Sequence, residues 1–152
     1  MEVFRLSREA FAKPLSGIGA SIKGGRWNSI GIEMIYTAQN RSLAMAEVAV
    51  HFSLACMPED YVMCSINIPD TLKIKTIKEQ DLPKNWRIFP HPNSTQKFGD
   101  KLILENKYVA CKIPSAVTKG DYNILINPRH KDFKLIKIGH IEKFPFDERM
   151  LK

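Results

Sequence analysis

Residues 24–51 read GGRWNSIGIEMIYTAQNRSLAMAEVAVH, and this stretch contains the features that decide the predicted fold. A glycine-rich segment comes first, and glycine repeats of this kind predict a loop with unusual backbone angles. Met34–Ala38 is apolar and β-prone, which predicts a strand. Residues 42–56 then have the spacing of a helix, with Asn40 or Ser42 as its N-cap. The stretch therefore predicts a loop, a strand and a helix in succession.

One carboxylate in the predicted helix lies where an apolar residue is expected. Leu43, Val50 and Leu54 recur at helical spacing and predict the buried face. Glu47 projects from that same face, and His51 follows it one turn later. Because burying an unpaired charge is costly, Glu47 needs a partner or a polar cavity. It is therefore either a structural ion-pair or edge residue, or a catalytic carboxylate at the wall of a pocket.

The loop over residues 13–31 contains a second unusual group. Gly24 and Gly25 permit a tight turn, and Arg26 then offers five donors in a fixed fork that suits a phosphate. Trp27 beside it could shield or pack such a site. The segment matches neither the P-loop pattern GxxxxGK[ST] nor a helix-opening GxGxxG. A turn with a surface arginine and a core tryptophan is the alternative interpretation.

The remainder of the chain is predicted to contain mostly strands. A proline-marked irregular stretch contains Trp86, Ile88 and Phe89, and is expected to pack onto the same domain. Strands at both ends with helices between them predict an α+β fold, with a mostly antiparallel sheet flanked by helices. We expect a single domain over residues 1–152. The expected helix is Thr95–Glu105, capped by Ser94, and the expected strands are Val3–Leu6, Tyr61–Ile68 (half-buried), Tyr108–Val117, Asn123–Asn127 and Phe133–Phe144.

Composition limits the class of protein further. The chain has 152 residues and a formal net charge of +7, which suggests an anionic partner. Cys56, Cys64 and Cys111 cannot form a fully paired disulfide framework, and without a CxxC or HExxH pattern we expect no metal site. The first residues lack a signal-peptide pattern, and no apolar run approaches the roughly 20 residues of a membrane span. We therefore expect a cytoplasmic protein that does not enter a membrane.

The motifs, taken in order, resemble the RES domain family. They span nearly the whole chain, and the three residues that give the family its name are present as Arg26, Glu47 and Ser115. The matching segments are GGRWNSIG at 24–31, YTA at 36–38, LAMAEVAVH at 43–51, IPSA at 113–116 and NILINPRHKDF at 123–133.

The resemblance implies a toxin of a toxin–antitoxin pair with an ADP-ribosyltransferase-like fold. Such toxins cleave NAD⁺ at the nicotinamide–ribose bond by hydrolysis or phosphorolysis, which depletes NAD⁺ and arrests bacterial growth. NAD⁺ is then the substrate, and no cofactor is expected. The implied partner is an Xre-like helix-turn-helix antitoxin, which blocks the active site and binds DNA on behalf of the pair. A homodimer is also plausible by resemblance.

The resemblance also suggests roles for individual residues. Glu47 would stabilise the positive charge that builds up on the ribose, as carboxylates do in glycoside hydrolysis, and Arg26 would hold a phosphate. These two are the candidate catalytic residues. Ser115 would hydrogen-bond the ligand or orient Glu47. The other expected substrate contacts are Tyr36 (stacking on nicotinamide), Arg5 (a second phosphate contact), Trp27 and Asn28, with His51 and Asn127 in supporting positions. For Asn127, which precedes Pro128, a turn-forming role is the favoured alternative.

Three alternatives remain open at this point. A protein mono-ADP-ribosyltransferase would use the same residues on NAD⁺ but transfer ADP-ribose to a side chain. A basic nucleic-acid-binding module is suggested by charge alone, because residues 71–152 carry 17 Lys and Arg against nine Asp and Glu. No DNA- or RNA-binding motif supports it. A catalytically inactive interaction protein would have no need of the Arg26, Tyr36, Glu47 and Ser115 set.

Overall fold

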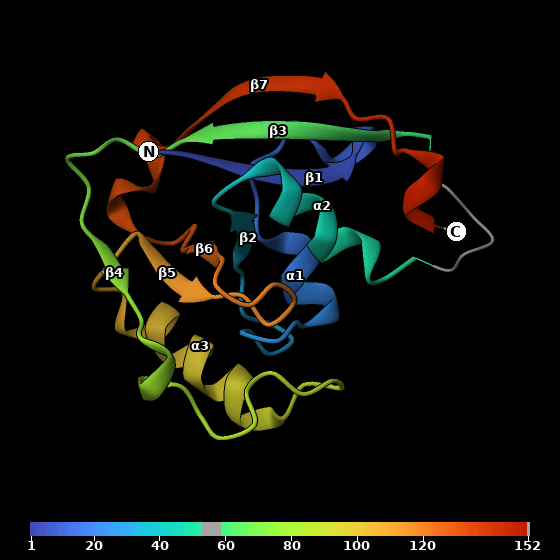
Figure 1. Ribbon diagram of the computed structural model, residues 1–152. Helices are drawn as coiled ribbons and strands as arrows, with labels where there is room; N and C mark the ends of the chain where they lie inside the picture. The colour runs from blue at the N-terminus through green and yellow to red at the C-terminus, as the bar shows by residue number, and fades with distance from the viewer. Residues whose placement is uncertain (53–58, 152) are drawn as a thin grey trace.

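The computed structural model describes residues 1–52 and 59–151, and its strands form one seven-stranded sheet (Figure 1). The strand order is β4-β5-β6-β2-β1-β3-β7. Every neighbouring pair is antiparallel except β4 and β5, which are parallel. The predicted α+β fold with a mostly antiparallel sheet is thus confirmed. The strands are β1 (Glu2–Arg8), β2 (Ile35–Ala38), β3 (Tyr61–Asn67), β4 (Ile74–Thr76), β5 (Ala110–Pro114), β6 (Tyr122–Ile126) and β7 (Lys137–Lys143).

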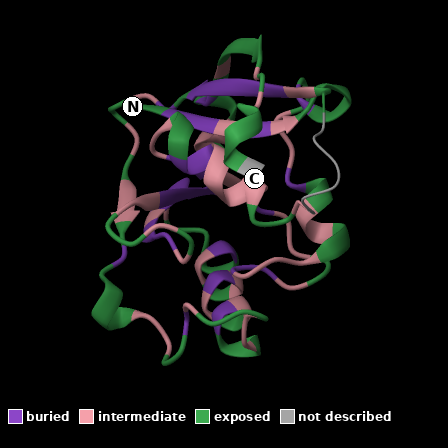
Figure 2. Ribbon diagram, turned by 45° about the vertical axis from the view of Figure 1, so that its right-hand side comes forward, coloured by how far each residue is buried: buried purple, intermediate pink, exposed green. Residues whose placement is uncertain are grey.

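The sheet is buried on both faces over much of its area, as the purple strands in Figure 2 show. Strand β3 illustrates this, because all five residues from Val62 to Ile66 are buried. The prediction of a half-buried β3 is therefore wrong. Val62 and Cys64 pack with Ala12 on one face, while Met63 packs with the residues beneath helix α2 on the other. The alternation of residues along a strand indicates which side chains lie on which face. It does not indicate whether other elements cover both faces.

Helix α2 (Arg41–Ala49) begins as predicted and ends earlier than predicted. Its N-cap is Asn40, whose side chain accepts a hydrogen bond from the Leu43 N–H. Leu43 and Ala44 pack on β1 and β2, and Figure 1 shows α2 in front of these strands. Val50, which follows the last helical residue, is 59% exposed. The prediction that Val50 belongs to a buried helix face is wrong.

The other helical segments also differ from expectation. The predicted end of α2 at Cys56, together with Leu54, lies outside the described residues. Within the predicted loop over 13–31, Ile18–Lys23 forms a short helix, α1. Helix α3 (Asn93–Glu105) matches its prediction, but its N-cap is Pro92 and not Ser94.

The last predicted strand is shorter than expected at its start. Lys131–Leu135 forms a 3-10 helix, in which the ring of His130 accepts a hydrogen bond from the Asp132 N–H. Such a local side-chain bond favours a turn over an extended backbone. The strand β7 therefore begins only at Lys137. Across residues 1–52 and 59–151, no helix combines the length and hydropathy needed to span a bilayer.

Candidate active site

A hydrogen bond between Ser115 and Glu47 is the centre of the candidate site. Glu47 lies on α2, half-buried, and its Oε1 accepts a 2.9 Å hydrogen bond from Ser115 Oγ just after β5. Ser115 is fully buried, and its Oγ also accepts from the N–H groups of Val117 and Thr118. A serine bonded in this way has one orientation, so it fixes one oxygen of the Glu47 carboxylate. Of the two roles expected for Ser115, the geometry favours orienting Glu47.

Arg26 is anchored by main-chain carbonyl groups from a distant segment. Its Nη1 donates to the carbonyl oxygens of Trp86 at 2.6 Å and Ile88 at 2.8 Å. Burial lowers the pKa of Arg26, while the negative charge of Glu47 acts in the opposite direction. The two charges are therefore close enough to influence one another. Because only Nη1 takes part in these bonds, the guanidinium still has donors that a phosphate could use.

Tyr36 holds the glycine-rich loop in shape. Its hydroxyl accepts from the Trp27 N–H at 3.0 Å and donates to Asn28 Oδ1 at 2.6 Å. The Asn28 amide in turn donates to the carbonyl oxygens of Ala20 and Ile32. Burial is the main reason why the pKa of Tyr36 is raised, so the hydroxyl keeps its proton. Asn28 is fully buried with these bonds, and it shapes the loop that presents Arg26.

Helix α3 also holds the same loop in place, a contact that the sequence did not predict. Gln96 Nε2 donates to the carbonyl oxygens of Gly25 and Asn28, and Asp100 accepts from the N–H and hydroxyl of Ser29. Gly99 lies so close to the loop that a Cβ there would be 1.7 Å from the Trp27 carbonyl oxygen. A glycine inside a predicted helix was the available signal, because it often marks a close approach of another segment.

Trp27 belongs to the core and not to an open surface. It is 3% exposed, and its ring lies 6.2 Å from that of Trp86 and 6.0 Å from that of Phe98. Substrate contact through its ring is therefore not supported by this structure. Its position agrees with the alternative interpretation, in which Trp27 is a core residue.

Arg5 is separated from the other candidate residues by the sheet. Phe4 pairs with Ala38 and packs with Leu43 of α2, so the neighbouring Arg5 points to the opposite face. There its Nη2 donates to the Phe11 carbonyl oxygen. The expected phosphate contact of Arg5 beside Arg26 is not supported by this arrangement.

The two supporting residues differ in their surroundings. His51 follows the end of α2 and is exposed. Asn127 is buried, and its amide donates to the Ile103 carbonyl and to Asn106 at the end of α3. Its Oδ1 accepts a hydrogen bond from the Arg129 N–H, and this bond closes a turn around Pro128. The turn interpretation of Asn127 is thus the one that its contacts support.

The small cavity between α3 and the sheet is not the site. It has a volume of about 10 Å³, enough for about one water molecule. Its lining is mostly apolar: Met34, Leu102, Ile103, Tyr108, Ala110, Cys111, Leu125 and Asn127. Within the part of the chain that the structure describes, no group of three or more His, Cys, Asp or Glu side chains is placed to hold a metal ion.

The family is decided by a match over almost the whole chain. The family model for the RES domain matches residues 2–147. The chain belongs to the RES domain family. Arg26, Glu47 and Ser115, the three residues on which the resemblance rested, all lie within the matched range, and the last two are hydrogen-bonded.

Curated relatives of this RES domain are toxins. The Prs ADP-ribosylating toxin of Sphingobium sp. (strain YBL2) is 33% identical over 143 residues, which are 93% of this chain and 89% of the relative. A Toxin Res of Yersinia enterocolitica is 33% identical and covers 99% of both chains. A Toxin Res of Photorhabdus laumondii is 32% identical over 100% of this chain and 98% of the relative.

A solved structure has the same fold. A chain in the crystal structure of the M. tuberculosis MbcT-MbcA toxin-antitoxin complex superposes with a TM-score of 0.76, over 99% of this chain and 86% of that one. The two sequences are 18% identical, so this likeness shows the fold of the RES domain alone.

Proposed function

We propose that this RES domain is the toxin of a toxin–antitoxin pair and that it cleaves NAD⁺ at the nicotinamide–ribose bond. The observation that carries the proposal is the half-buried carboxylate of Glu47, fixed by Ser115 and within electrostatic range of Arg26. A carboxylate that is held in one orientation and interacts electrostatically with an arginine suits a substrate with a developing positive charge and a pyrophosphate. The toxin names of the relatives support the same function.

In the proposed reaction, Glu47 would make the largest contribution to catalysis. As the bond from ribose C1′ to the nicotinamide nitrogen breaks, its electron pair leaves with nicotinamide and positive charge builds on the sugar. Nicotinamide leaves as a neutral molecule because it is cationic in NAD⁺, so no strong general acid is required. With Oε1 held by Ser115, Oε2 of Glu47 would accept from a ribose hydroxyl and stabilise the charge.

Arg26 and Tyr36 would bind the two ends of the reacting half of NAD⁺. The donors of Arg26 other than Nη1 would take a phosphate of the pyrophosphate. The ring of Tyr36, whose hydroxyl is fixed on the loop, would stack on nicotinamide. NAD⁺ is the substrate in this proposal, and no separate cofactor or metal ion takes part.

The acceptor of ADP-ribose distinguishes two versions of the reaction. Water or phosphate as acceptor gives NAD⁺ hydrolysis or phosphorolysis, whereas a protein side chain as acceptor gives mono-ADP-ribosylation. The second version is a specific candidate because one relative is named an ADP-ribosylating toxin. NAD⁺ labelled in its ADP-ribose half separates them: label on a protein supports transfer, and free ADP-ribose or its phosphate supports cleavage.

The partner of this toxin is proposed to be an antitoxin that covers the active site. The similar fold in a toxin-antitoxin complex supports an antitoxin, and we propose an Xre-like helix-turn-helix protein that binds DNA for the pair. The toxin itself would act in the cytoplasm, as a monomer or a homodimer, without binding DNA directly. Salt-sensitive DNA binding by the isolated chain without NAD⁺ turnover would instead support the nucleic-acid-binding alternative.

The deciding experiment is the release of nicotinamide from NAD⁺ by the purified protein, with and without phosphate. Glu47→Gln removes the charge but keeps the shape, and we expect it to lower turnover by about 100-fold or more. The Glu59→Gln variant, an exposed carboxylate outside the site, serves as the matched control. Full activity of Glu47→Gln would refute the role of Glu47, and no nicotinamide from the wild-type protein would refute the function.

A further inference from the structure

The segment Trp86–Ile88 connects the two candidate catalytic residues. Arg26 donates to the carbonyl oxygens at both ends of this segment, while Arg87 in its middle donates from Nη1 to the carbonyl oxygen of Ser115 at 3.3 Å. Ser115 in turn donates to Glu47. A continuous series of contacts therefore runs from Arg26 to Glu47 through a part of the chain that neither motif contains.

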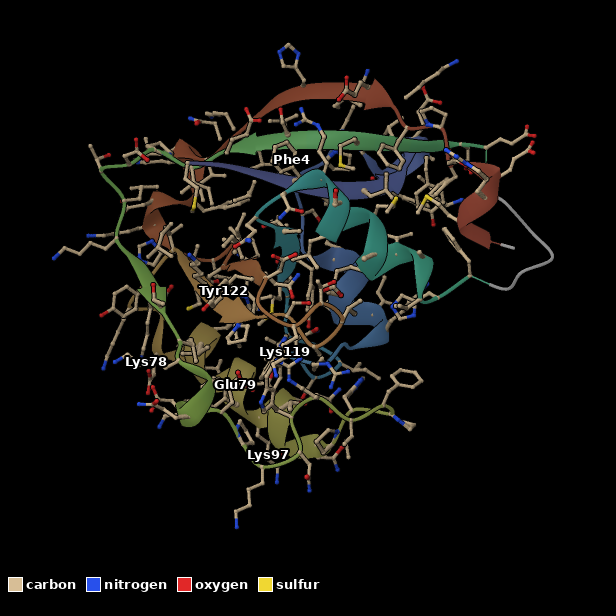
Figure 3. The ribbon with its side chains drawn as sticks, viewed as in Figure 1. Phe4, Lys78, Glu79, Lys97, Lys119 and Tyr122 are labelled. Carbon is tan, nitrogen blue, oxygen red and sulfur yellow. The ribbon has the colours of Figure 1, made fainter. Side chains whose placement is uncertain are left out.

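Arg87 is held in place by two further contacts. Its guanidinium carbon lies 4.4 Å from the centroid of the Trp86 ring, and Trp86 itself is buried against Trp27. Its Nη2 lies 3.6 Å from Oε1 of Glu79, on a 3-10 helix (Glu79–Asp81). Figure 3 labels Glu79, which belongs with α3 to the half of the molecule away from β7. A planar guanidinium can make all three contacts at once, which a lysine cannot.

We propose that Arg87 is a positioning residue, which holds the main chain of Ser115 so that Ser115 keeps the Glu47 carboxylate in one orientation. This inference rests on the proposed function for its effect on turnover. Ser115 is completely buried, with its N–H bonded to the Asp121 carbonyl and its hydroxyl bonded to Glu47. If Arg87 is removed, the Ser115 carbonyl loses its donor in a buried place, which is costly. The residue would then turn to find another partner and carry its hydroxyl away from Glu47.

The contacts of Arg87 favour this role over direct binding of a phosphate. One of its terminal nitrogens faces the Ser115 carbonyl, the other faces Glu79, and one face of its guanidinium covers Trp86. A group that acts only through Ser115 and Glu47 should affect the chemical step more than the binding of NAD⁺. A phosphate-binding group would mainly raise KM.

Steady-state cleavage of NAD⁺ by Arg87→Ala provides the first test. We expect kcat to fall about tenfold while KM changes by less than about twofold. The Arg87→Lys variant should recover part of the loss, because its ammonium can reach one of the two partners but not both. Arg8→Ala is the matched control, since Arg8 is an exposed arginine paired with Asp60 away from the site. A rise in KM with unchanged kcat would overturn the proposal.

Coupling to Ser115 provides the second test. In the proposed series of contacts, Arg87→Ala combined with Ser115→Ala should be no slower than the slower of the two single variants. Fully additive losses would mean that Arg87 acts by another route, and would overturn the proposal.

The third measurement does not depend on turnover. The N–H groups of Val117 and Thr118 are protected by Ser115 Oγ, so their hydrogen exchange should become faster in Arg87→Ala and remain unchanged in Arg8→Ala. Unchanged exchange in Arg87→Ala would overturn the inference even if NAD⁺ cleavage were established. Faster exchange in a protein that releases no nicotinamide would refute the proposed function while supporting the contact from Arg87 to Ser115.

Discussion

Ser115 and Glu47 are separated by 68 residues in the chain, yet the hydroxyl of Ser115 donates a 2.9 Å hydrogen bond to the carboxylate of Glu47. Ser115 follows strand β5 and Glu47 lies on helix α2, so the bond joins these two elements at the candidate site. The same hydroxyl accepts two main-chain N–H groups, which makes Ser115 both a structural residue and a positioning residue.

Replacing Ser115 with alanine should therefore lower stability and activity together. The variant leaves the N–H groups of Val117 and Thr118 and an oxygen of Glu47 without their partner, and we expect a loss of about 1–3 kcal/mol in the free energy of unfolding. Urea unfolding and nicotinamide release measure the two effects. Ser94→Ala, on the exposed start of α3 without a capping bond, should change neither. Wild-type activity of Ser115→Ala would contradict the positioning role.

Adding one methyl group at Gly99 should disturb the loop that carries Arg26. The new Cβ would lie 1.7 Å from the Trp27 carbonyl oxygen, so α3 and the loop must move apart. We expect Gly99→Ala to cost about 1–3 kcal/mol or more in unfolding free energy, and also to reduce turnover. Gly19→Ala, on α1, is the matched control, because the new Cβ there would have nothing within 4 Å of it. If both variants unfold at the same temperature, the close packing of α3 against the loop is wrong.

Tyr36→Phe separates the two functions assigned to this residue. The variant keeps the ring that would stack on nicotinamide, but it removes the hydroxyl that bonds Trp27 and Asn28. We expect about 1–3 kcal/mol lower stability, from the polar groups left unpaired. Activity per folded molecule should fall less than in Tyr36→Ala, which loses both ring and hydroxyl. Thermal unfolding together with nicotinamide release on the same samples gives the comparison, and equal turnover of the two variants would exclude a role for the ring.

Stability should fall in alkaline solution because of Cys111. Burial raises the pKa of this thiol from about 9 to about 11. The folded protein thus holds the proton more tightly than the unfolded chain does, so the stabilisation is complete below pH 9 and is lost as the pH rises toward 11. This difference in pKa corresponds to roughly 2–3 kcal/mol in the free energy of unfolding. Urea unfolding at pH 8 and pH 10.5 measures the loss, which should be smaller in Cys111→Ala. Equal losses in the two proteins would rule out Cys111 as the cause.

Much of the local structure could be predicted from the sequence. Alternation and β-prone composition located β1, β2, β3, β5 and β6, and the Asn40 cap located the start of α2. The position of Glu47 on an apolar helix face marked it as unusual, and its bond to Ser115 supplies the partner that such a carboxylate needs. Except for that bond, these features depend on residues that are neighbours in the chain, so their pattern is visible in the sequence.

Other features depend on contacts between distant segments and were not predictable in this way. The short strand β4, for example, exists because β5 pairs with it in parallel. Gln96 and Asp100 gain their roles from a loop about 70 residues earlier.

The sequence by itself predicted the family and the fold class and singled out Arg26, Glu47 and Ser115 as candidate site residues, because these predictions rest on residue types at short spacing within each motif. Only the tertiary structure decided which residues meet: it placed Arg5 on the opposite face of the sheet and Arg87 against Ser115. The physical reason is that hydrogen bonds act over about 3 Å in space, whatever the separation of the partners along the chain.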